Sequence, residues 1–258
     1  MRFPQLLGNR VKRFARKCWL PGAGVDDLSY LADKFGSDKG TLFDAHQYTR
    51  VYKSLFDRIR ENDIVFVEMG LLRVDVDERR PNNGSEGSTA TSGLRAPSLE
   101  MWRTYFPRAP LFGFDIDDFS SVHIDGCTIV RGDMSLVTDL ARLVGTINNS
   151  LDIVIDDASH ASHHQQIAFG YLFPHLRSGG MYIIEDLHWL DPSMEREGAP
   201  TTRDVLRKLQ VAGAFRSPFL TSQQQRYIEA NLARVMLFDS LSTKSDDATD
   251  ALGIMIKK

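Results

Sequence analysis

The segment LDIVIDDASHASHH, residues 151–164, places two acids and three histidines directly after a short apolar run. The acids are Asp156 and Asp157, and the first histidine is His160. Carboxylates bind hard divalent cations, and a neutral imidazole accepts a proton near physiological pH. These residue types in this order indicate a metal site, a general base or both. A strand that runs out into a polar loop is the simpler alternative.

Acids recur at the ends of the other apolar runs in the chain. They are Glu68, Asp115, Asp133, Glu185 and Asp186. Each lies at or just beyond the carboxyl end of a segment that we expect to be a strand. In an open sheet of parallel strands, ligands bind outside the carboxyl ends of the strands. The pattern therefore predicts one acid-lined crevice.

One group of these acids suits a metal ion. If the strands that end at Asp157 and at Glu185 are neighbours, their ends lie about 5 Å apart. Three carboxylates at that separation repel one another unless they are protonated or neutralised by a cation. Hard oxygen ligands favour Mg²⁺ or another divalent cation. Because Asp156 and Asp157 point to opposite faces of a strand, we assign Asp157, Glu185 and Asp186 to the metal and Asp156 to the cofactor side.

His160 lies three residues beyond Asp157, where it can take the proton of a hydroxyl bound beside the metal. We therefore predict that it is the general base. His160 and His164 would share one face of a helix, which raises zinc as an alternative. No HExxH glutamate or cysteine partner is near, so we expect His163 and His164 to be ordinary helix residues.

A second group of residues suits a nucleoside cofactor. Glu68 and Gly70 end the first strand, Asp115 ends the second and Asp133 ends the third. An acid after the second strand commonly accepts hydrogen bonds from ribose, and a glycine lets the backbone approach a ligand. MGLLRVD follows at residue 69 without the glycines of GxGxxG, so a pyrophosphate cradle is not supported. S-adenosylmethionine (SAM), which has no phosphate and carries a cationic sulfonium, fits an acid-lined crevice better.

The elements that must position these residues alternate between strands and helices. Apolar runs predict strands at 64–70, 111–117, 128–135, 151–157 and 181–187, with helices between them. The segment HQQIAFGYLFPHLRSGG is expected to be a helix that stops at its Gly-Gly pair. Two further strands close the chain without a helix between them. We expect an α/β fold with a Rossmann-like, doubly wound, mostly parallel seven-stranded sheet and an antiparallel C-terminal edge strand.

The other segments carry compositional signals. Residues 1–24 form a basic arm, which we expect to dock on the domain or to make weak contact with an anionic membrane surface or an acidic partner. Residues 73–97 form a Gly/Ser/Asn-rich loop that we expect to be mobile. The formal net charge of −3 argues against a nucleic-acid partner. Two widely spaced cysteines fit a cytoplasmic location, and no segment has the roughly 18 apolar residues of a membrane span.

In order along the chain, VFVEMG, FGFDID, RGDMS, LDIVIDDASH and LRSGGMYIIEDL resemble the motif series of class I SAM-dependent methyltransferases. DDASH followed by GGMYIIEDL resembles more narrowly the metal-dependent sugar O-methyltransferases of macrolide biosynthesis, the mycinamicin type. The segments FGSDKG…HQYTRVYKSLF and PSLEMWRTYFP extend the likeness upstream. The resemblance implies Mg²⁺ ligands, a general base and SAM contacts. By motif these are Asp157, Glu185 and Asp186 for Mg²⁺, His160 for the base, and Glu68, Gly70, Asp115, Asp133 and Asp156 for SAM.

The chain departs from the family pattern in two places. Ala158 stands where relatives often have glycine, and Leu71–Leu72 replace the Gly-rich continuation of the first motif. In the upstream segment, Asp38, Lys39, His46 and Tyr48 fit equally well a lid over the site and ordinary surface or packing residues.

These expectations combine into one function. We predict a Mg²⁺-dependent O-methyltransferase that transfers a methyl group from SAM to a hydroxyl of a sugar or glycosylated product, either a polysaccharide or a natural-product glycoside. Its catalytic domain is expected over 63–258, with a helical lid over 25–62. A metal-dependent hydrolase or lyase built on the same carboxylates, and a non-catalytic scaffold with this fold, stay open as alternatives. A homo-oligomer and the identity of the acceptor also stay open.

Overall fold

A computed structural model describes residues 28–43, 46–75, 94–242 and 250–258. Its centre is a seven-stranded sheet with the order β5-β4-β1-β6-β7-β9-β8. The strands are β1 (Phe66–Met69), β4 (Leu111–Asp115), β5 (Cys127–Arg131), β6 (Leu151–Asp156), β7 (Leu176–Ile184), β8 (Leu232–Phe238) and β9 (Leu252–Lys257). A separate antiparallel pair is formed by β2 (Val74–Asp75) and β3 (Leu94–Arg95). The predicted α/β fold and seven-stranded sheet are confirmed.

Strand directions follow the prediction, with one refinement at the edge. Strands β5, β4, β1, β6 and β7 are parallel to one another, and β9 is antiparallel to both β7 and β8. The last strand of the chain is therefore antiparallel, as expected, and lies one place inside the edge. Because no helix separates β8 from β9, the two strands pair as a hairpin, and β8 becomes the outer strand.

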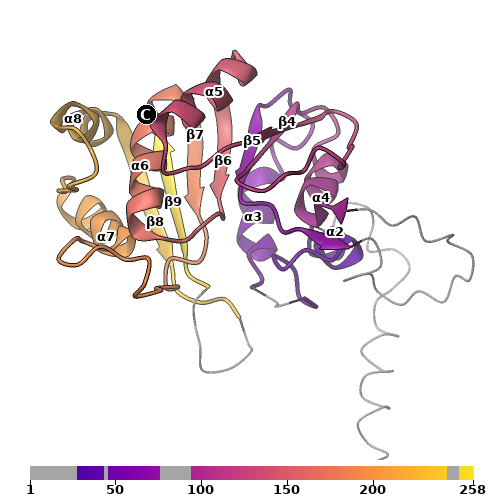
Figure 1. Ribbon diagram of the computed structural model, residues 1–258, viewed down its shortest axis with the longest axis horizontal. Coiled ribbons are helices and arrows are strands. Elements are labelled where there is room, and N and C mark those ends of the chain that lie inside the picture. Colours follow the sequence, from indigo (N-terminus) through magenta and orange to yellow (C-terminus); the bar gives the residue numbers. More distant parts are fainter. Residues whose placement is uncertain (1–27, 44–45, 76–93, 243–249) are drawn as a thin grey trace, which may run out of the picture.

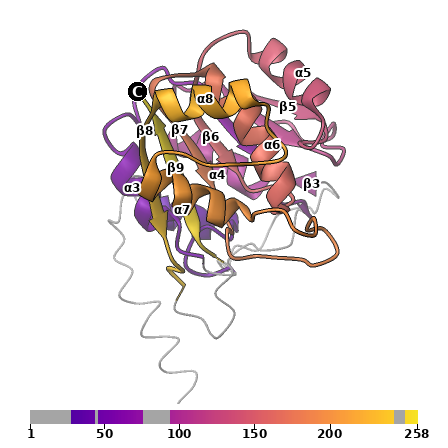
Figure 2. The same cartoon turned by 90° about the vertical axis from the view of Figure 1, so that its left-hand side faces the viewer.

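Helices cover both faces of the sheet. They are α2 (Leu28–Phe35), α3 (Thr49–Phe56), α4 (Pro97–Tyr105), α5 (Val137–Ile147), α6 (Ser162–Leu172), α7 (Thr202–Ala212) and α8 (Ser222–Asn231), with a 3-10 turn η1 (Phe173–His175) after α6. Helices α2, α3 and α4 pack on one face, and α5 to α8 pack on the other (Figure 1). Figure 2 looks onto α6, α7 and α8. The sheet is therefore doubly wound.

Burial on both faces explains why the strands read as continuous apolar runs. Every residue of β6 is buried, as are the last five residues of β7. Successive side chains serve opposite faces: Phe66 of β1 lies in the core under α2 to α4, and Val67 lies in the core under α5 to α8. Trp102 of α4 is fully buried in the first of these cores.

The order of the strands places a crevice at the end of β1. The chain moves outward from β1 to β4 and β5, and then returns to β6 on the other side of β1. Ligands of open α/β sheets bind outside the carboxyl ends of the strands at such a reversal. The ends of β1, β4 and β6 therefore meet where the sequence placed its acids.

The predicted helix that stops at a Gly-Gly pair is wrong at its C-terminal end. Helix α6 ends at Leu172, the 3-10 turn contains Pro174, and β7 begins at Leu176. Proline lacks a backbone N–H and cannot continue a helix. Gly179, with φ of 76°, lies inside β7. The glycine pair therefore lies within a strand.

Of three further predicted regions, two are partly described and one lies outside the described residues. Helices α2 and α3, from the expected lid over 25–62, pack into the same core as α4. Of the loop 73–97, the described ends form β2 and β3. The basic arm 1–24 and the middle of that loop lie outside the described residues. Within the described part of the chain, no helix is long and apolar enough to cross a membrane. The domain boundaries stay predictions.

Candidate active site

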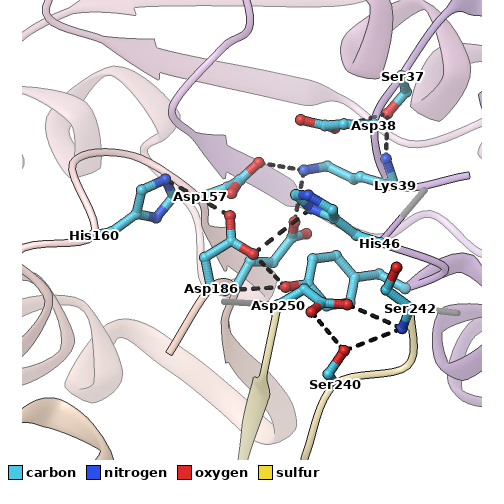
Figure 3. Close-up of polar contacts among 12 residues, drawn as sticks. Ser37, Asp38, Lys39, His46, Asp157, His160, Asp186, Ser240, Ser242 and Asp250 are labelled. Carbon is cyan, nitrogen blue, oxygen red and sulfur yellow. Dashed lines mark hydrogen bonds and ion pairs between the residues drawn. The ribbon is translucent and has the colours of Figure 1, made fainter. Parts of the chain in front are cut away.

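Two acidic strand ends meet at the carboxyl edge of β6 and β7. The strands are parallel neighbours, with Asp156 paired to Ile184. The backbone N–H of Glu185 donates to the carbonyl oxygen of Asp156 at 3.0 Å, which ties the two ends together. Asp157 and Asp186 follow these positions and reach the same site from different strands (Figure 3).

Asp157, His160 and Asp186 form a compact group of potential metal ligands. One ligand atom from each lies within 4.8 Å of the others. Among the residues that the structure describes, no other set of three acidic, histidine or cysteine side chains has this geometry. His160 and Asp186 both have left-handed backbone, with φ of 57° and 53°. Such strain in residues other than glycine is concentrated at functional sites.

Glu185, the third predicted metal ligand, is turned to other partners. Its side chain is fully buried. Oε2 accepts a hydrogen bond from Lys39 Nζ at 2.9 Å, and Oε1 accepts one from Tyr52 OH at 2.5 Å. The structure thus groups Asp157 and Asp186 with His160, and keeps Glu185 beside them. The assignment of Glu185 to a metal stays a prediction.

Lys39 brings a positive charge into the acidic cluster. Its side chain is only 1% exposed. Nζ makes a close ion pair with Asp157 Oδ2 (Figure 3) and lies 2.9 Å from Glu185 Oε2 and 3.5 Å from Glu68 Oε1. Lys39 is therefore not a surface residue, and a lid over the site and a packing role both stay predictions for it.

Two residues that follow Lys39 in the chain, His46 and Tyr48, contact the carboxylate of Asp186. Tyr48 OH donates a short hydrogen bond to Asp186 Oδ1, and the N–H of Asp186 donates to Tyr48 OH at 3.1 Å. His46 Nδ1 lies 3.6 Å from the same carboxylate oxygen (Figure 3). Tyr52, which donates to Glu185, is a residue of this cluster that the sequence analysis did not single out. A buried tyrosine hydroxyl needs a partner, and that requirement was the available signal.

Burial and charge together set the protonation of the cluster. Burial, reinforced by Asp157, raises the pKa of Glu185 well above its usual range, and Lys39 opposes this rise. Burial also raises the pKa of Asp157, again against Lys39. Burial alone would lower the pKa of Lys39, but Asp157 and Glu185 hold it well above its ordinary value. Without a further cation, these carboxyls therefore hold their protons to a higher pH than usual.

A cavity of about 460 Å³ opens beside the ligand group. Its size lies in the range of small-molecule sites. Asp157, His160 and Asp186 line one side. The other lining residues include three that were predicted to bind the cofactor. These are Gly70, Asp115 and Asp133, accompanied by the apolar Leu71, Leu72, Ile116 and Met134.

Gly70 and Asp115 shape the wall of this cavity. Gly70 has φ of 84°, and a Cβ atom there would lie 2.1 Å from the carbonyl oxygen of Asp157. The glycine is therefore required because two strand ends pass close together. Asp115 Oδ2 accepts a hydrogen bond from the N–H of Leu71 at 2.6 Å, which closes the loop after β1 onto β4.

Glu68 and Asp156 lie behind the cavity wall. Both are fully buried. Glu68 Oε1 accepts a hydrogen bond from Trp102 Nε1 at 3.2 Å, and Asp156 Oδ2 accepts one from Tyr182 OH at 2.9 Å. Burial raises the pKa of each carboxyl to about 7. Glu68 Oε2 and Asp156 Oδ1 have no hydrogen-bond partner among the described residues. The direct contact of either residue with a cofactor stays a prediction.

His163 and His164 do not join the ligand group. Their rings pack against each other with centroids 4.0 Å apart, and His164 Nδ1 lies 2.8 Å from Ser159 Oγ. Burial lowers the pKa of both imidazoles. His164 therefore does not join His160 in the shared metal site that the zinc alternative requires.

Sequence comparison finds relatives for most of the chain, whereas protein-family models give no match. The chain is 36% identical over 177 residues to the 8-demethyl-8-(2-methoxy-alpha-L-rhamnosyl)-tetracenomycin-C 3'-O-methyltransferase of Streptomyces olivaceus, over 69% of this chain and 40% of that protein. It is 29% identical over 247 residues to the mycinamicin VI 2''-O-methyltransferase of Micromonospora griseorubida, over 90% of this chain and 56% of that protein. The chain thus spans about half, or less, of these curated relatives.

Structure comparison agrees with the sequence relatives. The chain matches the MycE methyltransferase from the mycinamycin biosynthetic pathway, in complex with Mg, SAH and mycinamycin VI. The TM-score is 0.64 at 26% identity, and the match covers 90% of this chain and 54% of MycE.

Proposed function

We propose that this chain, which is related to the sugar O-methyltransferases of natural-product glycosides and has the class I methyltransferase fold, transfers a methyl group from SAM to a sugar hydroxyl with the help of Mg²⁺. The observation that carries the proposal is the meeting of Asp157, His160 and Asp186 at one side of the cavity. A cofactor in the cavity and an acceptor beside the ligand group would then be in contact.

The cavity suits the nucleoside part of SAM. Asp115 and Asp133 offer carboxylate oxygens to hydroxyl and amino groups, whereas Ile116 and Met134 offer apolar surface to a base. Asp157 and Asp186, the acids of the ligand group that also line the cavity, suit the positive charge of a sulfonium. Besides Asp115 and Asp133, we assign Gly70 to the cavity wall. Glu68 and Asp156 are assigned to the layer behind it.

The ligand group suits a hard divalent cation. Lys39 and Tyr48 each hold one oxygen of a carboxylate, which leaves Asp157 Oδ1 and Asp186 Oδ2 able to turn to an ion. Carboxylate oxygens with open positions favour Mg²⁺. When bound, such a cation lowers the pKa of the acceptor hydroxyl and fixes its orientation. Glu185 remains the predicted third carboxylate of this site.

His160 is the proposed acceptor of the hydroxyl proton. Its Nε2 lies 3.8 Å from Asp186 Oδ2, and its ring centroid lies 5.4 Å from that of Trp189. The neighbouring carboxylate stabilises the imidazolium that forms when His160 takes the proton. The acceptor oxygen would then attack the methyl carbon of SAM, whose bond to sulfur breaks, so that S-adenosylhomocysteine leaves as a neutral thioether.

Trp189 supports a sugar as the acceptor. Its side chain is half-buried and lies next to the ring of His160. A sugar presents C–H groups that pack on an aromatic face, while its hydroxyls point to polar groups at the rim. The relatives' names specify rhamnosyl tetracenomycin and mycinamicin VI as acceptors of those proteins. We propose a natural-product glycoside for this chain. A cytoplasmic location, a homo-oligomer and membrane contact through the basic arm stay predictions from the sequence.

The decisive experiment incubates the full chain with SAM, Mg²⁺ and a panel of deoxysugar glycosides, and analyses the products by mass spectrometry. The expected product carries one added methyl group, and its formation stops in EDTA. Omitting SAM tests the rival hydrolase or lyase, which would still cleave the glycoside. Calorimetric titration with SAM tests the scaffold alternative. If millimolar SAM does not bind, the proposed function fails.

A further inference from the structure

Lys39 is an unusual lysine because its charged end lies wholly inside the protein. Its side chain is 1% exposed, and Nζ faces Asp157, Glu185 and Glu68. An ammonium group carries three N–H donors and no acceptor, so it can donate one hydrogen bond to each of these three carboxylates. Burial of such a charge is tolerated only when it is paired in this way.

The backbone of Lys39 is also hydrogen-bonded. The N–H of Thr49 donates to the carbonyl oxygen of Lys39 at 3.2 Å, and the N–H of Lys39 donates to Ser37 Oγ at 3.3 Å. Tyr52, on the helix that begins at Thr49, donates to the other oxygen of Glu185. The backbone at Lys39 is therefore hydrogen-bonded through both its N–H and its carbonyl oxygen, which limits how far the amino group can move away from the cluster.

A divalent cation and this amino group need the same carboxylates. Asp157 belongs to the ligand group and is also the ion-pair partner of Lys39. Two positive charges that share one carboxylate repel each other strongly when water is excluded. An ion that binds Asp157 must therefore overcome the repulsion of Lys39 or displace its amino group.

We propose that Lys39 is a tethered counter-cation that competes with the divalent ion for Asp157 and Glu185, so that it weakens metal binding and keeps the acidic cluster folded in the metal-free protein. This inference rests on the proposed function, because it assumes that a divalent ion binds at Asp157. Lys39 does not line the cavity, and its Nζ contacts lie within the cluster. A direct role in holding the cofactor is therefore the weaker alternative.

The test measures Mn²⁺ affinity by electron paramagnetic resonance in wild type, in Lys39→Met and in Lys257→Met, without cofactor. Lys257 is the matched control, because its Nζ donates to the carbonyl oxygens of Pro174 and Leu176 at 2.7 Å, at the other end of β7. We expect Lys39→Met to bind Mn²⁺ at least tenfold more tightly than wild type and Lys257→Met to bind as wild type does. We also expect Lys39→Met to melt at a lower temperature in EDTA and to gain more from added Mg²⁺.

The outcomes separate this inference from the proposed function. Unchanged or weaker Mn²⁺ binding by Lys39→Met overturns this inference alone, because Mn²⁺ binding by the wild-type protein still supports the metal site of the proposed function. No Mn²⁺ binding by any of the three proteins overturns the metal site and the inference together. Weaker SAM binding with unchanged Mn²⁺ binding would assign Lys39 to the cofactor instead.

Two further measurements serve if Lys39→Met does not fold. Lys39→Gln keeps an amide donor for the carboxylates, and its Mn²⁺ affinity is expected to rise as well. In the wild-type protein, nuclear magnetic resonance of the lysine ammonium groups is expected to show a shift of the Lys39 signal on adding Mg²⁺, with the Lys257 signal unmoved. A Lys39 signal that does not respond to saturating Mg²⁺ contradicts the competition.

Discussion

His160 and Asp186 face each other across the ends of β6 and β7, with Nε2 and Oδ2 3.8 Å apart and both residues in left-handed backbone. Residues other than glycine adopt this conformation at a cost, which the surrounding structure must offset. Here the loops that follow β6 and β7 approach each other at the point where the acceptor hydroxyl is proposed to lie. The geometry therefore places the proposed base next to a carboxylate that can stabilise its protonated form.

Replacing His160 by alanine is expected to lower the rate of methyl transfer by about 10²–10⁴-fold, because a general base contributes roughly that factor. SAM affinity should stay as in wild type, since the substitution leaves most of the cavity wall intact. The measurement is steady-state kinetics with calorimetric titration of SAM. His175→Ala, at the opposite end of β7, is the control and should retain the wild-type rate. A His160→Ala enzyme of undiminished rate would rule out this base.

Gly70→Ala is expected to destabilise the protein by at least about 2 kcal/mol, because it combines a strained φ with a steric overlap. The new Cβ would lie 2.1 Å from the backbone oxygen of Asp157, which cannot move without shifting β6. Gly145→Ala in α5 is the matched control, since no atom lies within 4 Å of a Cβ there. That control should be neutral or gain up to about 1 kcal/mol. Urea unfolding of the three proteins measures the difference, and equal stabilities would contradict the close approach.

Trp189→Ala is expected to raise KM for the sugar acceptor roughly tenfold, which corresponds to about 1.4 kcal/mol. The reason is the loss of the aromatic face beside His160. KM for SAM should not change, because Trp189 does not line the cavity. Trp189→Phe, which keeps an aromatic face, should recover part of the loss. Equal acceptor KM in the alanine and wild-type enzymes would remove Trp189 from the acceptor site.

Glu68 is expected to make stability fall as pH rises from about 4.5 to about 7 in the metal-free protein. Burial raises the pKa of its carboxyl from 4.5 to about 7 in the folded chain. Between these values the folded state holds a proton that the unfolded state has released, so the free energy of unfolding decreases with rising pH. The loss is at most about 3.4 kcal/mol, since each unit of pKa shift corresponds to about 1.36 kcal/mol.

Glu68→Gln removes this titration and should flatten the dependence of unfolding free energy on pH over that range. Denaturation in EDTA at several pH values provides the measurement. Glu61→Gln, at an exposed position, is the control and should keep the wild-type slope. A Glu68→Gln protein with the wild-type slope would mean that other groups cause it.

The parts of the site that depend on local pattern were predictable from the sequence. Continuous apolar runs identify buried parallel strands, and an acid at the end of such a run must lie at the carboxyl edge of the sheet. This reasoning anticipated that Asp157 and Asp186 would meet. It failed at Gly179, because a glycine pair after a helical pattern reads as a helix end, whereas Pro174 had already ended the helix.

The partners of the buried charges were decided only by the tertiary structure. Lys39 lies 118 residues from Asp157 and 146 from Glu185, and no local periodicity links them. Their contact depends on how α3 packs over the sheet and on which way each carboxylate turns. By itself, the sequence determined the strands, their acidic ends and the proposed base. Packing across the sheet decided that a lysine and two tyrosines hold those acids, because such contacts depend on the three-dimensional arrangement of distant segments.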